Sequence, residues 1–401
     1  SALGLDVMCG ALNCGFMHAA PTEPIYAKPP HNAHLYDPRI GPNTWWECKK
    51  AINGGRRALK DFNDWFGTEL EKLGFRRLRV DSQMFVNADL GVYFHVHVDD
   101  PCACGTREAL HHVFAELSKV MLLRYDDVIK VGEKMKHLGD EYERTERGWI
   151  QRPDKDYVKN TLKIVNMEHC NPSNVIGVTE KLSPKELAED QEELDAEKTN
   201  QYRQVVGKCT FYCRKRVDMQ YGLKKLQSDM AKPTKGSFRR MKKFLRYMQG
   251  TKCYENKIEV SREEFERGIL KGYSDTDWAK NQETRKSVSC GILTIGGAVI
   301  NSYSRSQTVV VTSSAEAEFY GLAALSSEAM FVVNMLGELG FQFKGHLHAD
   351  SSSAKSMASR TGVGKVKHLE IRSLHVQDLI KRKYFVLHKI DGEDNPAGLG
   401  T

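Results

Sequence analysis

The stretch that decides the fold is residues 272–350. Its β-rich segments are GYSDTDWA (272–279), VSCGILTI (288–295), AVINSYS (298–304), TVVV (308–311) and HLHAD (346–350). These segments have the β-branched and aromatic content that is typical of strands. Between the fourth and the last, apolar residues at helical spacing predict a helix that begins at Ser313 and ends at Gly340. Strands joined by such a crossover helix predict one mixed sheet.

Three acidic residues stand at positions where this sheet would bring them together. Asp275 belongs to the first strand, Glu318 to the first turns of the helix, and Asp350 ends the strand after the helix. Carboxylates that converge repel one another unless a cation neutralises them. Mg²⁺ suits such a cluster because it prefers hard oxygen ligands and keeps several waters, and Mn²⁺ is the alternative ion. Two such ions about 4 Å apart hold a scissile phosphate between an activated water and the leaving oxygen.

Spacing alone leaves other interpretations open. The three acids are also compatible with surface carboxylates or helix-capping groups, which are common in a chain of 401 residues. Alternatively, DTD (275–277) begins an Asp-nucleophile phosphatase. That enzyme class needs a doubly wound sheet, and the hairpin strands that follow Asp277 argue against it.

Positive charge is concentrated in one segment. The net charge is +7, yet residues 201–250 hold 14 Lys and Arg against Asp218 and Asp229, a local balance of +12. The helix expected over GSFRRMKKFLRYMQG (236–250) places apolar residues on one face and basic residues on another. The basic residues are Arg239, Arg240, Lys242, Lys243 and Arg246. Such a segment predicts a nucleic-acid partner, with a solvated helix face as the plainer alternative.

Cysteine usage and hydropathy indicate an intracellular protein. The ten cysteines lack paired zinc-ribbon spacing, so we expect free thiols in a reducing compartment. No run of 18 apolar residues occurs, so we expect no membrane partner. The N-terminal SALGLDVMCG lacks an initiator Met and a signal-peptide pattern, which suggests a trimmed or partial chain.

Six segments, in order, resemble the ribonuclease H domain of copia-type retrotransposon polyproteins. They are GYSDTDWA, RKSVSCG, SRSQTVVVTSSAEAEFYGL, HADSSSA, KHLEIRSLHVQDLI and EDNPAGL. The resemblance implies a nuclease that cuts the RNA strand of RNA–DNA hybrids with Mg²⁺. The catalytic and metal-binding acids that it implies are Asp275, Glu318 and Asp350.

The resemblance has one departure at the site. The family's final acid falls on Gly398, so one metal ligand is missing there, and neighbouring Asp394 is a candidate to substitute partly. Asp277 is expected to be structural, and Trp278 to lie in the core. His368 and His375 match family positions and are expected to be packed or surface residues, with assistance to product release as the alternative.

The first half of the chain resembles the reverse transcriptase of the same family. LDVMCGALNCGF, followed by IYAKPP, resembles the palm segment with the first polymerase acid, which is Asp6 here. FHVHVDD resembles the strand–turn–strand that carries the acid pair, which is Asp99 and Asp100 here. The resemblance implies that these three acids bind the two metals that align a primer end with a nucleotide triphosphate, on a DNA/RNA template–primer.

The departures in this half are larger. His97 stands where the family has Tyr, and Arg57 stands at a Gln position expected to contact the nucleotide. The segment that holds most of the fingers would precede Asp6. These features favour a reverse transcriptase–ribonuclease H fragment with polymerase ancestry, in which polymerisation is uncertain. The alternative is a catalytically degenerate nucleic-acid-binding remnant.

The sequence therefore predicts an α+β and α/β multidomain chain. We expect a partial palm at 1–178, an acidic linker at 179–200, basic thumb or connection helices at 201–267 and a ribonuclease H-like mixed sheet with flanking helices at 268–401. The expected location is intracellular, in a cytoplasmic particle or the nucleus. RNA–DNA hybrid is the expected partner, and other segments of a longer polyprotein are further candidates.

Overall fold

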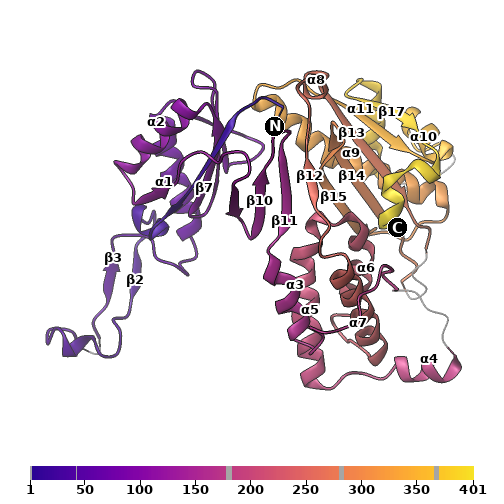
Figure 1. Ribbon diagram of the computed structural model, residues 1–401, viewed down its shortest axis with the longest axis horizontal. Helices are drawn as coiled ribbons and strands as arrows, with labels where there is room; N and C mark the ends of the chain where they lie inside the picture. Colours follow the sequence, from indigo (N-terminus) through magenta and orange to yellow (C-terminus); the bar gives the residue numbers. More distant parts are fainter. Residues whose placement is uncertain (1, 42, 178–182, 280–283, 365–369) are drawn as a thin grey trace. The chain divides into compact units, whose positions relative to one another are not determined.

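The computed structural model describes residues 2–41, 43–177, 183–279, 284–364 and 370–401 (Figure 1). Its contacts divide the chain into two compact units. The smaller unit comprises Leu3–Glu133 with Glu338–Gly340, and the larger unit comprises Ser1–Ala2, Lys134–Gly337 and Phe341–Thr401. The division falls between residues 133 and 134, within the segment expected as the partial palm.

The smaller unit is built on a six-stranded antiparallel sheet. The strand order is β4 (Arg76–Arg77), β5 (Met84–Asn87), β6 (Val92–His97), β7 (Asp100–Gly105), β1 (Asp6–Leu12) and β8 (Leu123–Tyr125). Helices α1 (Ala58–Lys72) and α2 (Arg107–Ser118) pack on it, and a separate ribbon pairs β2 (Ile25–Ala27) with β3 (Trp46–Cys48). Buried aromatic rings of Phe62, Phe66, Phe94 and Phe114 fill the core.

The sequence over residues 46–73 predicts a helix that ends at Gly74, but the helix in the structure is shorter. Residues 46–48 form strand β3 instead, and the helix begins only at Ala58. Gly54 adopts a φ of +84°, which no right-handed helix accommodates. The sequence also predicts a hairpin over MFVNADLGVYFHVHV (84–98) and a helix near 106–120, and both are present.

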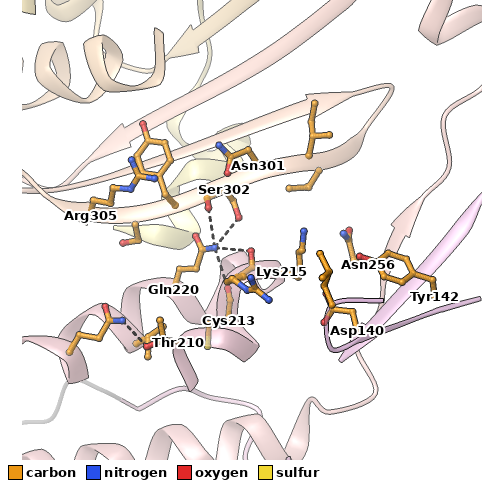
Figure 2. A pocket seen from close by; sticks show the side chains of 18 residues that line it. Asp140, Tyr142, Thr210, Cys213, Lys215, Gln220, Asn256, Asn301, Ser302 and Arg305 are labelled. Carbon is orange, nitrogen blue, oxygen red and sulfur yellow. Dashed lines mark hydrogen bonds between the residues drawn. The ribbon is translucent and has the colours of Figure 1, made fainter. Parts of the chain in front are cut away.

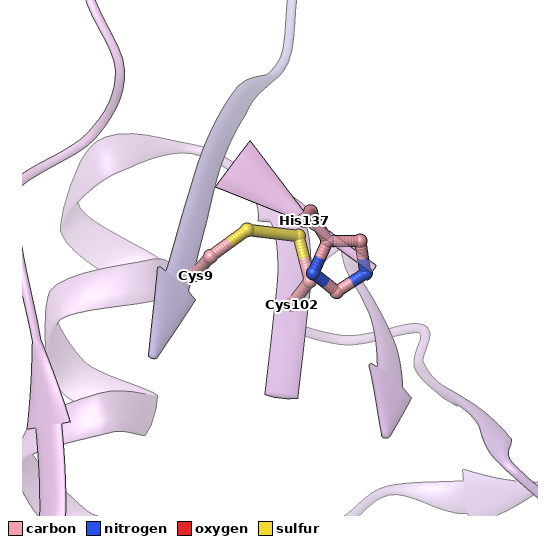
Figure 3. A group of neighbouring side chains, drawn as sticks. All are labelled: Cys9, Cys102 and His137. Atoms are coloured by element: carbon pink, nitrogen blue, oxygen red, sulfur yellow. A yellow bond between two sulfur atoms is a disulfide. The ribbon is translucent and has the colours of Figure 1, made fainter. Parts of the chain in front are cut away.

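One cysteine pair departs from the expectation of free thiols. Cys9 and Cys102 face each other across the β1–β7 ladder and form a disulfide (Figure 3). The other eight cysteines are free. The pairing arises from strand register, which spacing along the chain does not reveal.

The larger unit contains a four-stranded antiparallel sheet and a group of helices. The strand order is β12 (Asn256–Ile258), β11 (Trp149–Pro153), β10 (Asp140–Arg144) and β9 (Lys134–His137). The helices are α3 (Lys155–Lys163), α4 (Pro184–Asp190), α5 (Ala196–Tyr212), η3 (Cys213–Lys215), α6 (Val217–Ser228) and α7 (Lys235–Gly250). Tyr202, Met241, Phe244, Leu245 and Met248 share one buried core among these helices.

The expected acidic linker at 179–200 is largely helical where it is described. Residues 178–182 lie outside the described part, α4 covers Pro184–Asp190, and α5 begins at Ala196. Asp195 caps α5, because its side chain accepts a hydrogen bond from the Lys198 N–H. Asp190 is only 7 % exposed. The segment therefore contributes to the packed unit.

The C-terminal part forms the expected mixed sheet. Its strand order is β15 (Ala298–Ser306), β14 (Val288–Ile295), β13 (Ile269–Thr276), β16 (Lys344–Ala349) and β17 (Phe385–Lys389). The first three strands are antiparallel neighbours, whereas β13, β16 and β17 run parallel. The remaining elements are α8 (Arg262–Glu266), α10 (Ser352–Ser359), η4 (Ile371–Leu374), α11 (His375–Lys381), η5 (Gly392–Asp394) and η6 (Pro396–Gly400).

The crossover helix α9 (Ser314–Glu338) provides the core of this sheet. The Ser313 hydroxyl accepts the Glu316 N–H at 3.2 Å, as a helix cap does. Phe319, Leu322 and Leu325 are fully buried. By length and composition alone, α9 is long and apolar enough to span a membrane. The sequence expectation missed it, because α9 contains no uninterrupted run of 18 apolar residues. Core helices pass the same test, and these buried residues assign α9 to the core.

Two expectations near the sheet are wrong. Residues 308–311 form no strand, since the ladder of β14 and β15 ends at Ser306. Trp278 is 51 % exposed and therefore not a core residue, because β13 ends at Thr276 and the chain leaves the sheet there.

Candidate metal centre and nucleic-acid interface

Three carboxylates from three elements meet at one edge of the mixed sheet. Asp275 lies near the end of β13, Asp350 directly follows β16, and Glu318 lies in the first turns of α9. The parallel pairing of Ser274 with Ala349 brings the ends of β13 and β16 side by side. One oxygen of each carboxylate lies within 4.8 Å of the other two. The sequence-predicted nuclease acids are therefore brought together.

Burial and mutual repulsion favour the protonated forms of two carboxyl groups in this cluster. Glu318 is 5 % exposed, and its Oε1 accepts the Thr276 N–H at 3.2 Å. Burial, then the charges of Asp275 and Asp350, raise the pKa of Glu318 to about 8. Burial and Asp275 also raise the pKa of Asp350. The cluster is thus an unfavourable concentration of negative charge that a proton or a cation relieves.

The donor set fits a hard divalent cation. Glu318 Oε2 is buried and has no hydrogen-bond partner among the described residues. The available ligand atoms are all carboxylate oxygens, which Mg²⁺ and Mn²⁺ prefer over nitrogen or sulfur. Asp275, Glu318 and Asp350 are therefore the residues that would hold such an ion.

The C-terminal segment lies against the same cluster. The Asn395 amide donates to the Ser274 carbonyl at 2.9 Å, and its oxygen accepts the Ala397 N–H at 3.2 Å. These bonds fix η6 so that a Cβ built on Gly398 would lie 3.9 Å from Asp275 Oδ2. The Thr401 hydroxyl donates to the same Asp275 oxygen. The position where the resembling family carries its final acid is thus beside the cluster.

A buried polar network supports the cluster from behind. The Gln307 amide donates to the Ser289 hydroxyl and to the Ala317 carbonyl, both at 2.8 Å. The Thr276 hydroxyl in turn donates to the Ser289 hydroxyl at 3.0 Å. Gln307 therefore ties the residue before Glu318 to the strand that carries Asp275. The sequence analysis assigned no role to Gln307. The only feature that could have indicated one is its position as a polar residue between a strand and the helix that carries Glu318.

The other residues singled out near the site lie outside the cluster. Asp277 accepts the Val288 N–H at 2.6 Å, which agrees with the structural role expected for it. Asp394 is exposed and does not belong to the cluster of three carboxylates. His375 is the first residue of α11, and His368 lies outside the described residues.

The predicted polymerase acids are not brought together. Asp6 is the first residue of β1 and pairs with Gly105. At the other end of β1, the Leu12 N–H donates to the Asp99 carbonyl at 2.7 Å, and Asp100 begins β7. Six residues of extended strand, about 20 Å, therefore separate Asp6 from the acid pair. The antiparallel register is the physical reason that these three acids do not share a metal in this structure.

The five predicted nucleic-acid-binding residues of α7 divide into two groups. Arg239 and Arg240 are partly buried, and they pair with Asp190 at 2.7 and 3.8 Å, while Arg240 also pairs with Asp229 at 3.0 Å. Lys242 and Arg246 are exposed, and Lys243 is partly buried. Much of the positive charge at the start of α7 is thus neutralised within the protein.

Comparison with known proteins gives a consistent picture. The chain is 27 % identical over 335 residues to the retrovirus-related Pol polyprotein from transposon RE1 of Arabidopsis thaliana, covering 82 % of this chain and 22 % of the relative. It is 24 % identical over 427 residues to the corresponding polyprotein from transposon TNT 1-94 of Nicotiana tabacum, covering 100 % of this chain and 30 % of the relative. The chain therefore spans less than a third of the length of these relatives. No family model matches it.

A solved structure supports the fold. The foamy viral protease–reverse transcriptase in complex with an RNA/DNA hybrid aligns with a TM-score of 0.54 at 12 % identity, covering 96 % of this chain and 44 % of that chain. At such identity the match concerns the fold, which is that of a reverse transcriptase palm followed by a ribonuclease H-like domain. The homologues of this chain are thus retrovirus-related Pol polyproteins from copia-type transposons, and its fold is that of a reverse transcriptase palm followed by a ribonuclease H-like domain.

Proposed function

We propose that the C-terminal domain is a metal-dependent ribonuclease H that hydrolyses the RNA strand of RNA–DNA hybrids. The observation that carries the proposal is the approach of Asp275, Glu318 and Asp350 to within 4.8 Å of one another. The expected setting is the interior of the cell, where the parent element would make such hybrids.

The residues divide the work between binding and proton transfer. Divalent ions, when bound, supply an activated water and stabilise the leaving oxygen. Asp275 and Asp350 are partly exposed and present their carboxylate oxygens at the edge of the sheet. Glu318 must lose its proton before its buried carboxylate serves as a ligand, because its pKa is raised to about 8. Thr276 holds Glu318 in place through its N–H.

A second candidate is a binding remnant that grips hybrid without cutting it. Gly398 favours this alternative, because it places no carboxylate beside Asp275 where the resembling family has one. The separation of Asp6 from Asp99 and Asp100 points the same way for the polymerase half. We therefore do not propose RNA-directed DNA polymerase activity for this chain and regard it as a property of its ancestor.

A cleavage assay separates the two candidates. The chain is incubated with Mg²⁺ and a hybrid labelled on its RNA strand, beside Asp275→Asn and the control Glu393→Gln. Glu393 is exposed and lies outside the carboxylate cluster. The proposal expects cleavage by the parent chain and the control and none by Asp275→Asn. Binding of the hybrid by all three without cleavage would support the remnant instead.

A further inference from the structure

A second polar cleft lies in the larger unit, and none of the three clustered carboxylates lines it. Its volume is about 540 Å³, which is within the range of small-molecule binding sites. One wall is the outer edge of β15, and another is η3 with the start of α6 (Figure 2). Asp140 and Tyr142 of β10, with Asn256 of β12, close the third side.

Hydrogen bonds join two walls of the cleft and order the third side. The Gln220 amide donates to the Ser302 hydroxyl at 2.9 Å and to the Cys213 carbonyl at 3.2 Å (Figure 2). On the third side, the Gln151 amide donates to Asp140 at 2.7 Å, and Asn256 donates to the Gln151 oxygen at 3.1 Å. The cleft is therefore preformed, so a ligand would bind without ordering new segments.

The charges in the cleft are unbalanced. Arg214, Lys215 and Arg305 line it, against Asp140 as the only acid among the described lining residues. Arg305 is paired with Glu328 at 2.7 Å. No carboxylate of the described residues lies within 4 Å of the Arg214 or Lys215 cation, and desolvation lowers the pKa of Lys215. Asp140, the acid of the lining, attracts both cations without a direct ion pair, so the cleft keeps an excess of positive charge.

The Arg214 and Lys215 side chains differ in a way that suits a phosphoryl group. The Arg214 guanidinium is held over the Phe211 ring, 4.1 Å from its centroid, which fixes a planar donor with several N–H groups. Lys215 adds a compact point charge from the adjacent position. Asn301, Ser302 and Ser304 of β15 add neutral polar groups on the opposite wall. A planar guanidinium, a compact ammonium group and neutral polar groups together are typical of sites that bind phosphate oxygens.

We propose that this cleft binds a phosphate-bearing anion through Arg214 and Lys215. The anion is either a free polyphosphate, such as the end of a nucleotide, or a backbone phosphate of nucleic acid. The plainer alternative is a solvated crevice with no preference for anions. The proposal does not depend on hydrolysis at Asp275, because binding is measured without cleavage.

Calorimetric titration of the whole chain with inorganic pyrophosphate tests the cleft itself. We expect saturable binding that Lys215→Ala weakens by about tenfold, the loss of one charge-assisted hydrogen bond. Lys252→Ala is the matched control, because Lys252 is exposed and does not line the cleft. Asp140→Asn removes the only acid of the lining and should tighten binding, so the paired variants move in opposite directions.

The source of the phosphate is tested by competition. Fluorescently labelled hybrid is bound in EDTA, where cleavage needs no further block and pyrophosphate cannot act by removing a divalent ion, and pyrophosphate is added. Displacement in the parent chain, but not in Lys215→Ala, assigns the cleft to backbone phosphate, whereas pyrophosphate binding without displacement assigns it to a free polyphosphate. Absence of pyrophosphate binding, or binding equal in the parent chain and Lys215→Ala, would overturn the proposal. Thermal unfolding of each variant without ligand checks that the fold is retained.

Discussion

Glu318 accepts a single hydrogen bond from the Thr276 N–H at 3.2 Å, while its second carboxylate oxygen is buried without a hydrogen-bond partner among the described residues. This pair joins the crossover helix to the strand that carries Asp275. A buried oxygen without a donor is costly in the absence of a cation. The folded chain therefore contains a site whose energy depends on protonation and on metal.

Protonation of Glu318 should make metal binding depend on pH. Its folded pKa of about 8 lies above the ordinary value of 4.5, so the proton on Glu318 stabilises the folded state below pH 4.5. That contribution is lost as the pH rises from 4.5 to 8. Without divalent ions, the melting temperature of the parent chain should fall over this range relative to Glu318→Gln. Mg²⁺ affinity should rise with pH and level off above about 8. Mg²⁺ affinity that is flat from pH 6 to pH 9 would contradict this assignment.

Restoring an acid at position 398 should strengthen the metal site. The Cβ of Gly398→Asp would lie 3.9 Å from Asp275 Oδ2, which is ordinary van der Waals contact, and Gly398 has no positive φ. A fourth carboxylate should lower the Mg²⁺ concentration needed for half-maximal cleavage of hybrid by about tenfold. Gly398→Asn is the neutral control, and an equal effect of Asn would mean that the carboxylate is not a ligand.

Gln307 should position Glu318 without contacting the metal. Gln307→Leu removes the bonds to Ser289 and Ala317, each at 2.8 Å, and leaves both partners buried. We expect a loss of stability of about 1–3 kcal/mol together with weaker Mn²⁺ binding. Gln307→Asn keeps a neutral amide, so its Mn²⁺ affinity should lie closer to that of the parent chain. Gln307→Glu should bind Mn²⁺ less well than Gln307→Asn, because the added negative charge repels Glu318. If Gln307→Leu lowers stability but leaves Mn²⁺ affinity unchanged, its role is packing alone.

Helix α7 should contact nucleic acid through only part of its basic set. Arg239 pairs with Asp190, which is 7 % exposed, so Arg239→Ala should mainly destabilise the fold, by about 1–3 kcal/mol. Lys242 and Arg246 are exposed, and each alanine variant should reduce the slope of hybrid affinity against salt by about one counterion. Fluorescence anisotropy at several salt concentrations measures this slope. The opposite ranking, with Arg239→Ala changing the slope most, would contradict the division.

The sequence predicted the mixed sheet and its acids because local signals and topology agree there. Asp275 and Asp350 each stand at the end of a strand, and Glu318 stands one turn inside a capped helix, so the pattern allowed all three to meet at one edge. The resemblance to the ribonuclease H domain then decided between a metal site and ordinary surface carboxylates. The Cys9–Cys102 disulfide and the separation of Asp6 from Asp99 depend on strand register, which no local pattern specifies.

Other errors came from partners that are distant in sequence. Arg239 looked like a free cation because Asp190, its partner, lies 49 residues away in a segment that reads as a solvated linker. Trp278 looked like a core residue because it follows a buried strand, yet the strand ends two residues earlier. Such contacts depend on how the elements pack, which composition and periodicity describe poorly.

The most direct measurement of the metal site is a titration of the parent chain and of Asp350→Asn with Mn²⁺ at pH 8, in which electron paramagnetic resonance detects the free ion. We predict saturable binding to the parent chain and binding weakened by at least about tenfold in the variant, because Asp350 supplies one of the three converging carboxylates. Equal affinities in the two proteins, with both folded, would show that these carboxylates do not share a metal and would contradict the nuclease assignment.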